Sequence, residues 1–351
     1  MKVALITDTH WGVRNDNSAF LDCNKKFLDD VFFPALKANE VTTLIHAGDL
    51  VDRRKYINIQ TANRLRTDYI QPIEEMGLTY HQILGNHDVY YKNTNEVNAV
   101  NEVYRNKFNV YESPAEVTVG GLPILFLPWI NMTNREASLA AIKNSNAKTC
   151  IGHLEIVGFE MHKGTVATHG EDRRLFDRFY HTLSGHFHRR STDGSISYLG
   201  SHGQFTWSDY GDNRGGYLYD TETLELDFIE NPYRMFSKAF YDDSGKTWEE
   251  IADQDFASFK GTYVKVVVKN KENPYWFDTF CSAIEKVGVI DMQVVEDHHN
   301  LNLENADDIV NEAESTVDIF KKYIDQLSLN VNRDKLEKTM IDLYNQAMTL
   351  S

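Results

Sequence analysis

Five short polar clusters along the chain carry side chains that could do chemistry. They combine histidine with aspartate or asparagine, and they are Asp8-Thr9-His10, Asp49, Asn86-His87-Asp88, His153 and His186-Phe187-His188. Imidazole nitrogens with a few carboxylate and amide oxygens suit first-row metals such as manganese, iron or zinc better than calcium. The set predicts two divalent cations, Mn²⁺ as first choice and Mg²⁺, Fe²⁺ or Zn²⁺ as alternatives, held about 3.5 to 4 Å apart by the bridging carboxylate of Asp49. Such a pair binds a phosphate and activates a water.

Each cluster follows a short apolar run that is typical of a buried strand. These runs cover residues 3–6, 43–45, 82–84, 149–151 and 182–184, and amphipathic helices are expected at residues 24–36, 59–76, 95–108 and 135–144. The alternation predicts an α/β sandwich. In such layered folds ligands gather at the carboxyl ends of strands, where all the polar clusters fall. Glycine directly before four of the clusters allows a tight turn and a close approach to a ligand.

A single one of these residues would carry little weight. An isolated histidine or aspartate at a strand end is usually a turn former or a hydrogen-bonded polar group. The series Asp-x-His, Gly-Asp, Gly-Asn-His-Asp, Gly-His and Gly-His-x-His, in that order after five apolar runs, is hard to produce by chance. We therefore interpret the clusters as parts of one site.

The series resembles the signature motifs of the calcineurin-like metallophosphoesterases. That resemblance implies a four-layer β-sandwich flanked by helices. It assigns Asp8, His10, Asp49 and His188 to the first metal and Asp49, Asn86, His153 and His186 to the second. His87 would contact the phosphate, where it stabilises charge or protonates the leaving oxygen.

Within that superfamily the chain is most similar to the SbcD-like recombination and repair nucleases, in particular the bacteriophage branch. The similarity rests on Leu127-Pro128-Trp129, on the run from Gly152 to Phe159 and on the run from Gly211 to Asp220. It covers residues 1–230 closely and the remainder in layout only. It implies a DNA exonuclease and endonuclease that works in a repair complex with an SMC-like ATPase.

One position departs from that nuclease family, which often has a histidine three residues after the bridging aspartate. Here that position is Asp52, and we interpret it as a structural partner of Arg53 or Arg54. Basic residues that directly follow the clusters could contact DNA phosphates, namely Arg53, Arg54, Lys55, Arg189 and Arg190. Tyr90, Tyr91, Trp207 and Tyr210 could stack on bases, although loop aromatic residues more often pack.

The rest of the chain suggests an appended unit and a tether. Residues 231–296 predict a small α/β cap, with strands at 262–269 and 289–295 and a helix at 276–287, and residues 297–314 predict an acidic linker. Residues 315–351 hold two amphipathic helices. By resemblance they dock on the coiled coil of the partner ATPase, and the alternative is that they fold back on the cap. The resemblance also predicts a homodimer through the helices at 59–76 and 95–108.

Composition narrows the class of protein. The chain has 351 residues, 42% of them hydrophobic, which is enough for a large core and argues against a disordered protein. A net charge of −16 argues against a broad basic surface, but bound cations and local arginines could still attract nucleic acid. Three scattered cysteines, Cys23, Cys150 and Cys281, fit a reducing compartment. With no apolar stretch of membrane length, we expect a cytoplasmic protein.

Three alternative functions remain at this point. The segment Gly48 to Arg53 also resembles the protein phosphatases of the superfamily, in which an arginine here would grip phosphate. A small-molecule phosphodiesterase would share the same cage without needing the appended unit. A DNA-end or ATPase-binding scaffold with a relict site would require a missing cage residue, and none is missing.

Overall fold

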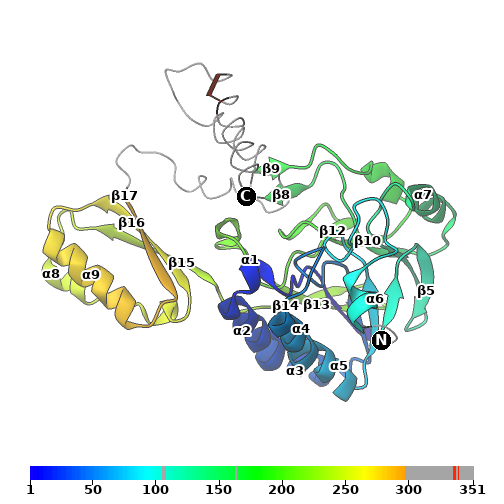
Figure 1. Cartoon of the computed structure of the whole chain (residues 1–351), viewed down its shortest axis with the longest axis horizontal. Coiled ribbons are helices and arrows are strands. Elements are labelled where there is room, and N and C mark those ends of the chain that lie inside the picture. The colour runs from blue at the N-terminus through cyan, green and yellow to red at the C-terminus, as the bar shows by residue number, and fades with distance from the viewer. Residues whose placement is uncertain (105–107, 163, 297–334, 337–338, 340–351) are drawn as a thin grey trace. The chain divides into compact units, whose positions relative to one another are not determined.

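The computed structural model describes residues 1–104, 108–162, 164–296, 335, 336 and 339 (Figure 1). The chain divides into two units, Met1–Val295 and Glu296–Ser351, and nearly all described residues belong to the first. The predicted linker at 297–314 and almost all of the predicted helical pair at 315–351 lie outside the described residues.

One six-stranded sheet carries the first three polar clusters. Its order is β14-β13-β1-β2-β3-β4, with bounds β1 Lys2–Ile6, β2 Thr43–His46, β3 Thr79–Ile83, β4 Asn109–Tyr111, β13 Gly215–Asp220 and β14 Leu226–Glu230. Strands β1 to β4 are parallel, and β13 pairs antiparallel with β1 and with β14. Because β1 and β2 are covered on both faces, they carry the uninterrupted apolar runs Val3 to Ile6 and Leu44 to Ile45 rather than an alternating pattern.

A second six-stranded sheet carries the other two clusters. Its order is β11-β12-β10-β7-β6-β5, with bounds β5 Ala115–Val119, β6 Leu122–Leu127, β7 Thr149–His153, β10 His181–Gly185, β11 Ser191–Thr192 and β12 Ile196–Tyr198. Strands β6, β7, β10 and β12 are parallel, while β5 and β11 are antiparallel to their neighbours. The carboxyl ends of β7 and β10 therefore lie side by side.

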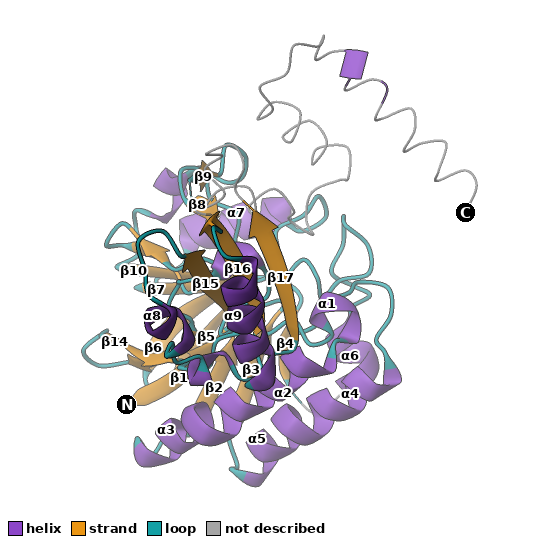
Figure 2. Cartoon of the chain, turned by 90° about the vertical axis from the view of Figure 1, so that its left-hand side faces the viewer, coloured by secondary structure: helices purple, strands orange, loops and turns teal. Residues whose placement is uncertain are grey.

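Helices predicted as single units contain wide turns. The first runs through α2 Ser18–Phe27, a π-helical turn Leu28–Phe32 and α3 Phe33–Ala38, after a short α1 at Val13–Asp16. The second runs through α4 Ile59–Leu65, a π-helical turn Arg66–Ile70 and α5 Gln71–Glu75. Figure 2 shows these helices alongside one another below the strands. Asn17 and Asn58 accept hydrogen bonds from backbone N–H groups of the first turns and so begin α2 and α4.

The remaining helices of the sandwich are shorter. They are α6 Ala99–Tyr104 and α7 Arg135–Asn144, with 3₁₀ turns at Arg173–Phe176 and Trp207–Asp209, and a small hairpin of β8 Glu160–His162 and β9 Thr165–Val166. The helix expected from residue 95 begins only at Ala99. The reason is that the Asn98 side chain accepts a hydrogen bond from the Asn101 N–H at 2.9 Å and caps the helix there.

Three apolar clusters show how the layers stack. Val3, Ile45, Phe126 and Ile151 belong to the cluster between the two sheets. A second cluster fills the space between the first sheet and helices α2 to α5, and a third lies between the second sheet and α7. The order is therefore helices, sheet, sheet, helices, which confirms the predicted four-layer α/β sandwich.

An appended α/β unit follows the sandwich and has its own core. It holds a three-stranded sheet, β15 Phe236–Asp242, β16 Tyr263–Asn270 and β17 Asp291–Glu296, with α8 Trp248–Ala252, a 3₁₀ turn at Ala257–Phe259 and α9 Pro274–Lys286. Tyr241, Val266 and Phe280 are buried in its apolar cluster. Among the described residues, no helix combines the length and the apolar character that crossing a membrane would require.

Candidate metal centre

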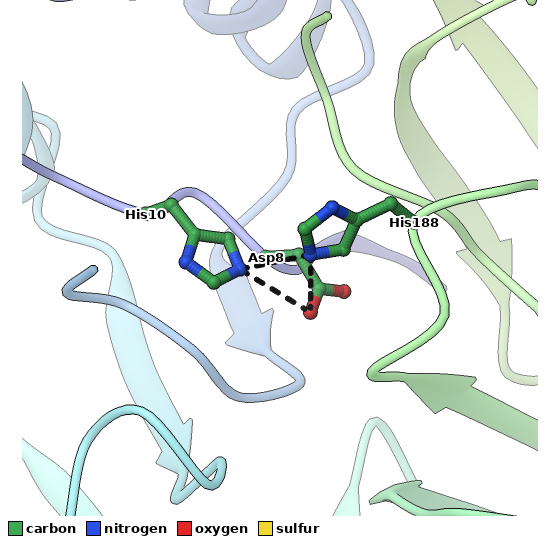
Figure 3. A group of neighbouring side chains, drawn as sticks. All are labelled: Asp8, His10 and His188. Atoms are coloured by element: carbon green, nitrogen blue, oxygen red, sulfur yellow. Dashed lines mark hydrogen bonds and ion pairs between the residues drawn. The ribbon is translucent and has the colours of Figure 1, made fainter. Parts of the chain in front are cut away.

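The first half of the site forms where β1 and β10 end. Asp8 and His10 follow β1, and His188 follows β10 in the opposite sheet. The Nε2 atoms of His10 and His188 face each other at 3.0 Å, and Asp8 Oδ1 lies 4.0 Å from each of them (Figure 3). Three ligand-type atoms thus converge on one point.

The second half lies beside the first and is built in the same way. His153 Nε2 is 3.0 Å from Asn86 Oδ1, and His186 Nδ1 is 2.9 Å from the same oxygen. Asp49 completes the group, because its Oδ2 lies 3.3 Å from His153 Nε2. Asn86 and Asp49 come from the first sheet, and both histidines come from the second.

Asp49 belongs to both halves. The Oδ2 atom that faces His153 also lies 3.6 Å from His10 Nε2. The side chain is 2% exposed, so no bulk water separates it from either group. The Asp49 carboxylate therefore faces donor atoms of both halves.

The backbone at the site is held in an uncommon conformation. Asp8, His10, Asp49 and His186 all have positive φ, between 42° and 89°. Such left-handed non-glycine residues cost about 1 to 3 kcal/mol each and cluster at functional sites. Packing is close around Asp49, since a Cβ on Gly85 would lie 2.3 Å from the Asp49 nitrogen. Hydrogen bonds from Asp8 N to Gly48 O and from His10 N to Asp49 O tie the two loops together.

Asp88 organises the loops without joining the cage. Its buried carboxylate accepts hydrogen bonds from the backbone N–H groups of Asp49, Leu50 and Gly85, at 2.8 to 2.9 Å, and from that of Val51 at 3.2 Å. Burial and the nearby Asp49 charge raise the pKa of Asp88 to about 7. The last residue of the third motif therefore positions the loop that carries Asp49.

The donor set fits divalent cations. Burial lowers the pKa of His186 to about 3 and holds the pKa of His188 well below its usual range, so both imidazoles are neutral at neutral pH, as ligation requires. Burial opposes a charge on His10 and His153 as well. Neighbouring carboxylates nevertheless raise the pKa of each to about 9. The buried carboxylates thus stabilise positive charge in the pocket, and bound cations would supply that charge in place of protons.

Contacts on the far side of two histidines decide which ring nitrogen faces the cage. The backbone oxygen of Ala47 accepts from His153 Nδ1 at 2.9 Å, which leaves Nε2 pointing at Asn86 and Asp49. Asp52 Oδ1 lies 3.3 Å from His10 Nδ1, an ion-pair contact rather than a hydrogen bond, and this charge favours a proton on that nitrogen. Such outer partners fix the tautomer and the ring orientation of a metal ligand.

The interpretation of Asp52 as a partner of Arg53 or Arg54 was wrong. Asp52 is buried against His10, and Arg53 instead donates to Asp16 Oδ2 at 2.7 Å and to Asn15 Oδ1 at 2.8 Å. The loop turns the Asp52 side chain inward toward the cage, while the side chain that follows it points toward α1. Adjacent residues of a loop often face opposite ways, which the sequence alone does not reveal.

His87 lies at the edge of the cage and forms hydrogen bonds with both Asp52 and Asp49. The His87 Nδ1 atom is 2.5 Å from the backbone oxygen of Asp52, and the His87 N–H donates to Asp49 Oδ1 at 2.7 Å. Its ring packs edge-on against the His10 ring, with centroids 4.9 Å apart. Because Nδ1 is engaged, Nε2 is the nitrogen that a substrate can meet.

The predicted DNA-contacting arginines differ in how firmly they are held. Arg53 is engaged by Asp16 and lies over the Tyr56 ring, Arg189 pairs with Glu160 at 3.4 Å, and Arg190 lies 3.7 Å from the Phe228 ring centroid. Arg54 forms no hydrogen bond or ion pair with the residues that the structure describes, and its Nη1 is buried. Half-burial lowers its pKa, while the Asp49 charge opposes that shift.

Two residues near the cage were not assigned to it from the sequence. Asp52 was noticed as a departure but not as a partner of His10. Trp129 was noted only as part of a similar motif, yet its ring centroid lies 5.1 Å from that of His186. The signal that could have found Trp129 is its place two residues after β6, at the same sheet edge as the clusters that follow β7 and β10.

Comparison with known proteins places the chain in a family. Residues 1–190 match the calcineurin-like phosphoesterase family. Exonuclease subunit 1 of Enterobacteria phage T4 is 31% identical over 352 residues, which cover 99% of this chain and 98% of that protein.

Among solved structures, a novel archaeal phosphodiesterase is 13% identical, with a TM-score of 0.33, over 66% of this chain and 99% of its own. A purple acid phosphatase from yellow lupin (Lupinus luteus) seeds is also 13% identical, with a TM-score of 0.36, over 54% of this chain and 38% of its own. On the family match and the full-length phage relative, this chain is a metal-dependent phosphoesterase that belongs to the calcineurin-like phosphoesterase family.

Proposed function

We propose that this protein is a two-metal DNA nuclease, the nuclease subunit of a DNA-processing complex. The observation that carries the proposal is the position of Asp49 between two half-sites, each completed by histidines from the opposite sheet. Asp8, His10, Asp49 and His188 would hold one cation, and Asp49, Asn86, His153 and His186 the other. The mixture of imidazole and oxygen donors favours Mn²⁺.

The chemistry suits phosphodiester hydrolysis. Two bound cations would orient the scissile phosphate, activate a water and stabilise the charge of the displacement. His87 Nδ1 donates to Asp52 O, so Nε2 faces the substrate: it would accept a hydrogen bond in the neutral ring and would donate a proton to the leaving oxygen from the imidazolium form. Arg54 has no ion-pair partner among the described residues, its charge interacts with that of Asp49, and it would bind a flanking phosphate.

DNA as the substrate is supported by the relative rather than by the cage alone. The phage protein that matches over nearly the full length of both chains is an exonuclease subunit. The phosphatase alternative depends on Arg53, which is occupied by Asp16 and Asn15 and would have to release both to reach a phosphate. That arrangement favours the nuclease over the phosphatase.

The test is Mn²⁺-dependent release of nucleotides from linear DNA by purified protein. His87→Ala and Asp49→Ala should abolish cleavage, and His181→Gln, a histidine outside the cage, should leave it unchanged. p-Nitrophenyl phosphate serves as a small substrate for the same cage. Hydrolysis of that ester without any DNA cleavage, even with a partner ATPase supplied, would keep the metal site and overturn the nuclease.

We also propose that an SMC-like coiled-coil ATPase binds the C-terminal segment and that the protein is a homodimer. The name of the phage relative, a subunit, supports a partner. For the dimer, Tyr56, three residues before α4, and Ile59, its first residue, are 61% and 88% exposed, which leaves apolar surface for a second copy. Truncation after Asp297 should abolish ATPase binding, and sedimentation should show a dimer at micromolar concentration. Retained binding, or a strictly monomeric profile, would contradict these proposals.

A further inference from the structure

Trp129 forms a wall of the second half-site. It follows β6 and Pro128, and its ring centroid lies 5.1 Å from that of His186 and 6.2 Å from that of His153. The His153 side chain behind it is fully buried, whereas Trp129 keeps part of its surface open to solvent. An indole ring thus stands at the boundary between the predicted metal ligands and the space outside.

The backbone of Trp129 is fixed on both sides of its Cα. Its N–H donates to the Leu84 carbonyl at 2.8 Å, and Leu84 is two residues before Asn86. Its carbonyl accepts from Asn95 Nδ2 at 3.1 Å and from Asn134 Nδ2 at 2.9 Å. The ring is therefore held in register with the loop that carries Asn86 and His87.

The asparagines that hold Trp129 form a buried network. Asn131 Nδ2 donates to Asn95 Oδ1 at 2.8 Å, and Asn134 Oδ1 accepts from the Asn131 N–H at 2.8 Å. All three are at most 8% exposed. Buried amides are tolerated only when they are hydrogen-bonded, and a satisfied network makes a loop rigid. This loop is accordingly built to hold the ring still.

The other aromatic side chains that the sequence offered as base contacts pack against residues outside the cage. Trp207 packs on Phe236 with centroids 4.7 Å apart and lies under the Lys265 ammonium. Tyr210 lies under the Lys238 ammonium at 4.9 Å. Tyr90 and Tyr91 pack edge-on against each other, and Tyr91 is 51% exposed. Trp129 differs from them by its contact with a predicted metal ligand.

We propose that Trp129 is the platform on which a nucleobase flanking the scissile phosphate stacks, which makes it a specificity-determining residue for nucleic acid over simpler phosphate esters. This inference rests on the proposed nuclease function. Stacking on a rigid, partly exposed ring suits every base, since each has a π-face, and so needs no sequence preference. It would also orient the phosphate on the cations beside His186.

The experiment compares oligonucleotides that carry an abasic residue on one side or the other of the cleaved bond. Wild-type protein should cleave one of the two about 5- to 150-fold more slowly in kcat/KM than the intact strand, the range that a base–aromatic stack is worth. Trp129→Leu, which keeps an apolar contact with His186, should cleave intact DNA more slowly by a similar factor and show no further loss on that abasic strand. Trp129→Phe should retain most of both properties.

Binding of Mn²⁺, followed by electron paramagnetic resonance, should be unchanged in Trp129→Leu, because the ring supplies no ligand. The proposal is overturned if wild-type protein tolerates both abasic strands, or if the variant keeps the full abasic penalty. It is also overturned if the variant loses Mn²⁺, which would make the ring a support of the cage only. Absence of any DNA cleavage by the wild-type protein is a different result, because it refutes the nuclease itself.

Discussion

Asp52 should control the affinity of one cation and not the other. Its carboxylate is 3.3 Å from His10 Nδ1 and 8% exposed, and among the described residues no other carboxylate lies within 4.0 Å of that nitrogen. Removing such an outer partner of a ligating histidine typically weakens metal binding 10- to 100-fold. Asp52→Ala should therefore weaken the first Mn²⁺ site by about one to two orders of magnitude.

The expected selectivity follows from the contacts of the two half-sites. His153 is oriented by the Ala47 carbonyl rather than by Asp52, so the second site should keep its affinity. Asp52→Asn should have a smaller effect, because the amide oxygen can still accept from His10 Nδ1 and only the charge is lost. Asp16→Asn is the matched control, since it removes a nearby acid that holds Arg53 and does not contact the cage.

The assay is a titration of metal-free protein with Mn²⁺, with free Mn²⁺ measured by electron paramagnetic resonance and heat by calorimetry. Wild-type protein should bind two ions, and Asp52→Ala should shift one of the two steps to higher concentration. Equal affinities of Asp52→Ala and wild-type protein at both steps would refute the reasoning, and so would equal weakening of both. Weakening of the same size in Asp16→Asn would show that net charge rather than orientation matters.

Three further predictions concern substrate, protons and metal. Arg54→Ala should lower kcat/KM on DNA by roughly 10- to 100-fold, as expected for loss of one charge-assisted hydrogen bond. Arg190→Ala removes a side chain that stacks on the Phe228 ring and should change kcat/KM little. Equal effects of the two substitutions in steady-state cleavage would contradict the assignment. Burial lowers the pKa of His81 below its ordinary value of 6.5, so the unfolded chain binds this proton more readily and the stability present above pH 6.5 falls as the pH drops toward the lower folded pKa. His81→Gln should lose less stability than wild-type protein between pH 7.5 and pH 5 in urea unfolding, and identical losses would refute the cause. Removal of cations with EDTA should lower the melting temperature, because ions that bind only the folded chain stabilise it, and re-addition of Mn²⁺ should restore it; an unchanged temperature would argue against a bound pair.

The sequence predicted where the site residues lie along the chain better than it predicted which way their side chains point. Apolar runs followed by polar clusters located the ends of β1, β2, β7 and β10 to within one or two residues, because strands buried on both faces leave a strong apolar signal. The same signal says nothing about how a loop turns its side chains. Asp52 was therefore assigned to Arg53 or Arg54 instead of His10, and the position of the Trp129 ring beside His186 depends on tertiary packing that the sequence does not show.

Helix boundaries were less predictable where local hydrogen bonds compete with the apolar period. The pattern indicated one helix over residues 59–76, and the structure has a π-helical turn at Arg66–Ile70 inside it. One extra residue in a turn shifts the apolar stripe slightly, which a period of 3.6 still tolerates. The assembly regions at 297–351 fall almost entirely outside the described residues, so those expectations stay predictions.

Because each half-site takes donors from both sheets, the distances between its donor atoms depend on the separation of the two sheets. Asp8, His10, Asp49 and Asn86 follow strands of one sheet, and His153, His186 and His188 belong to the other. The spacing between the two groups is set by the side chains that fill the interior, such as Ile45 and Phe126. A larger or smaller side chain there would shift one group of donors relative to the other without touching any of the seven residues. Substitutions in the interior between the sheets should therefore change the affinity for cations. Such substitutions can inactivate the enzyme although they lie far from the cage, because they alter the spacing of the donor atoms.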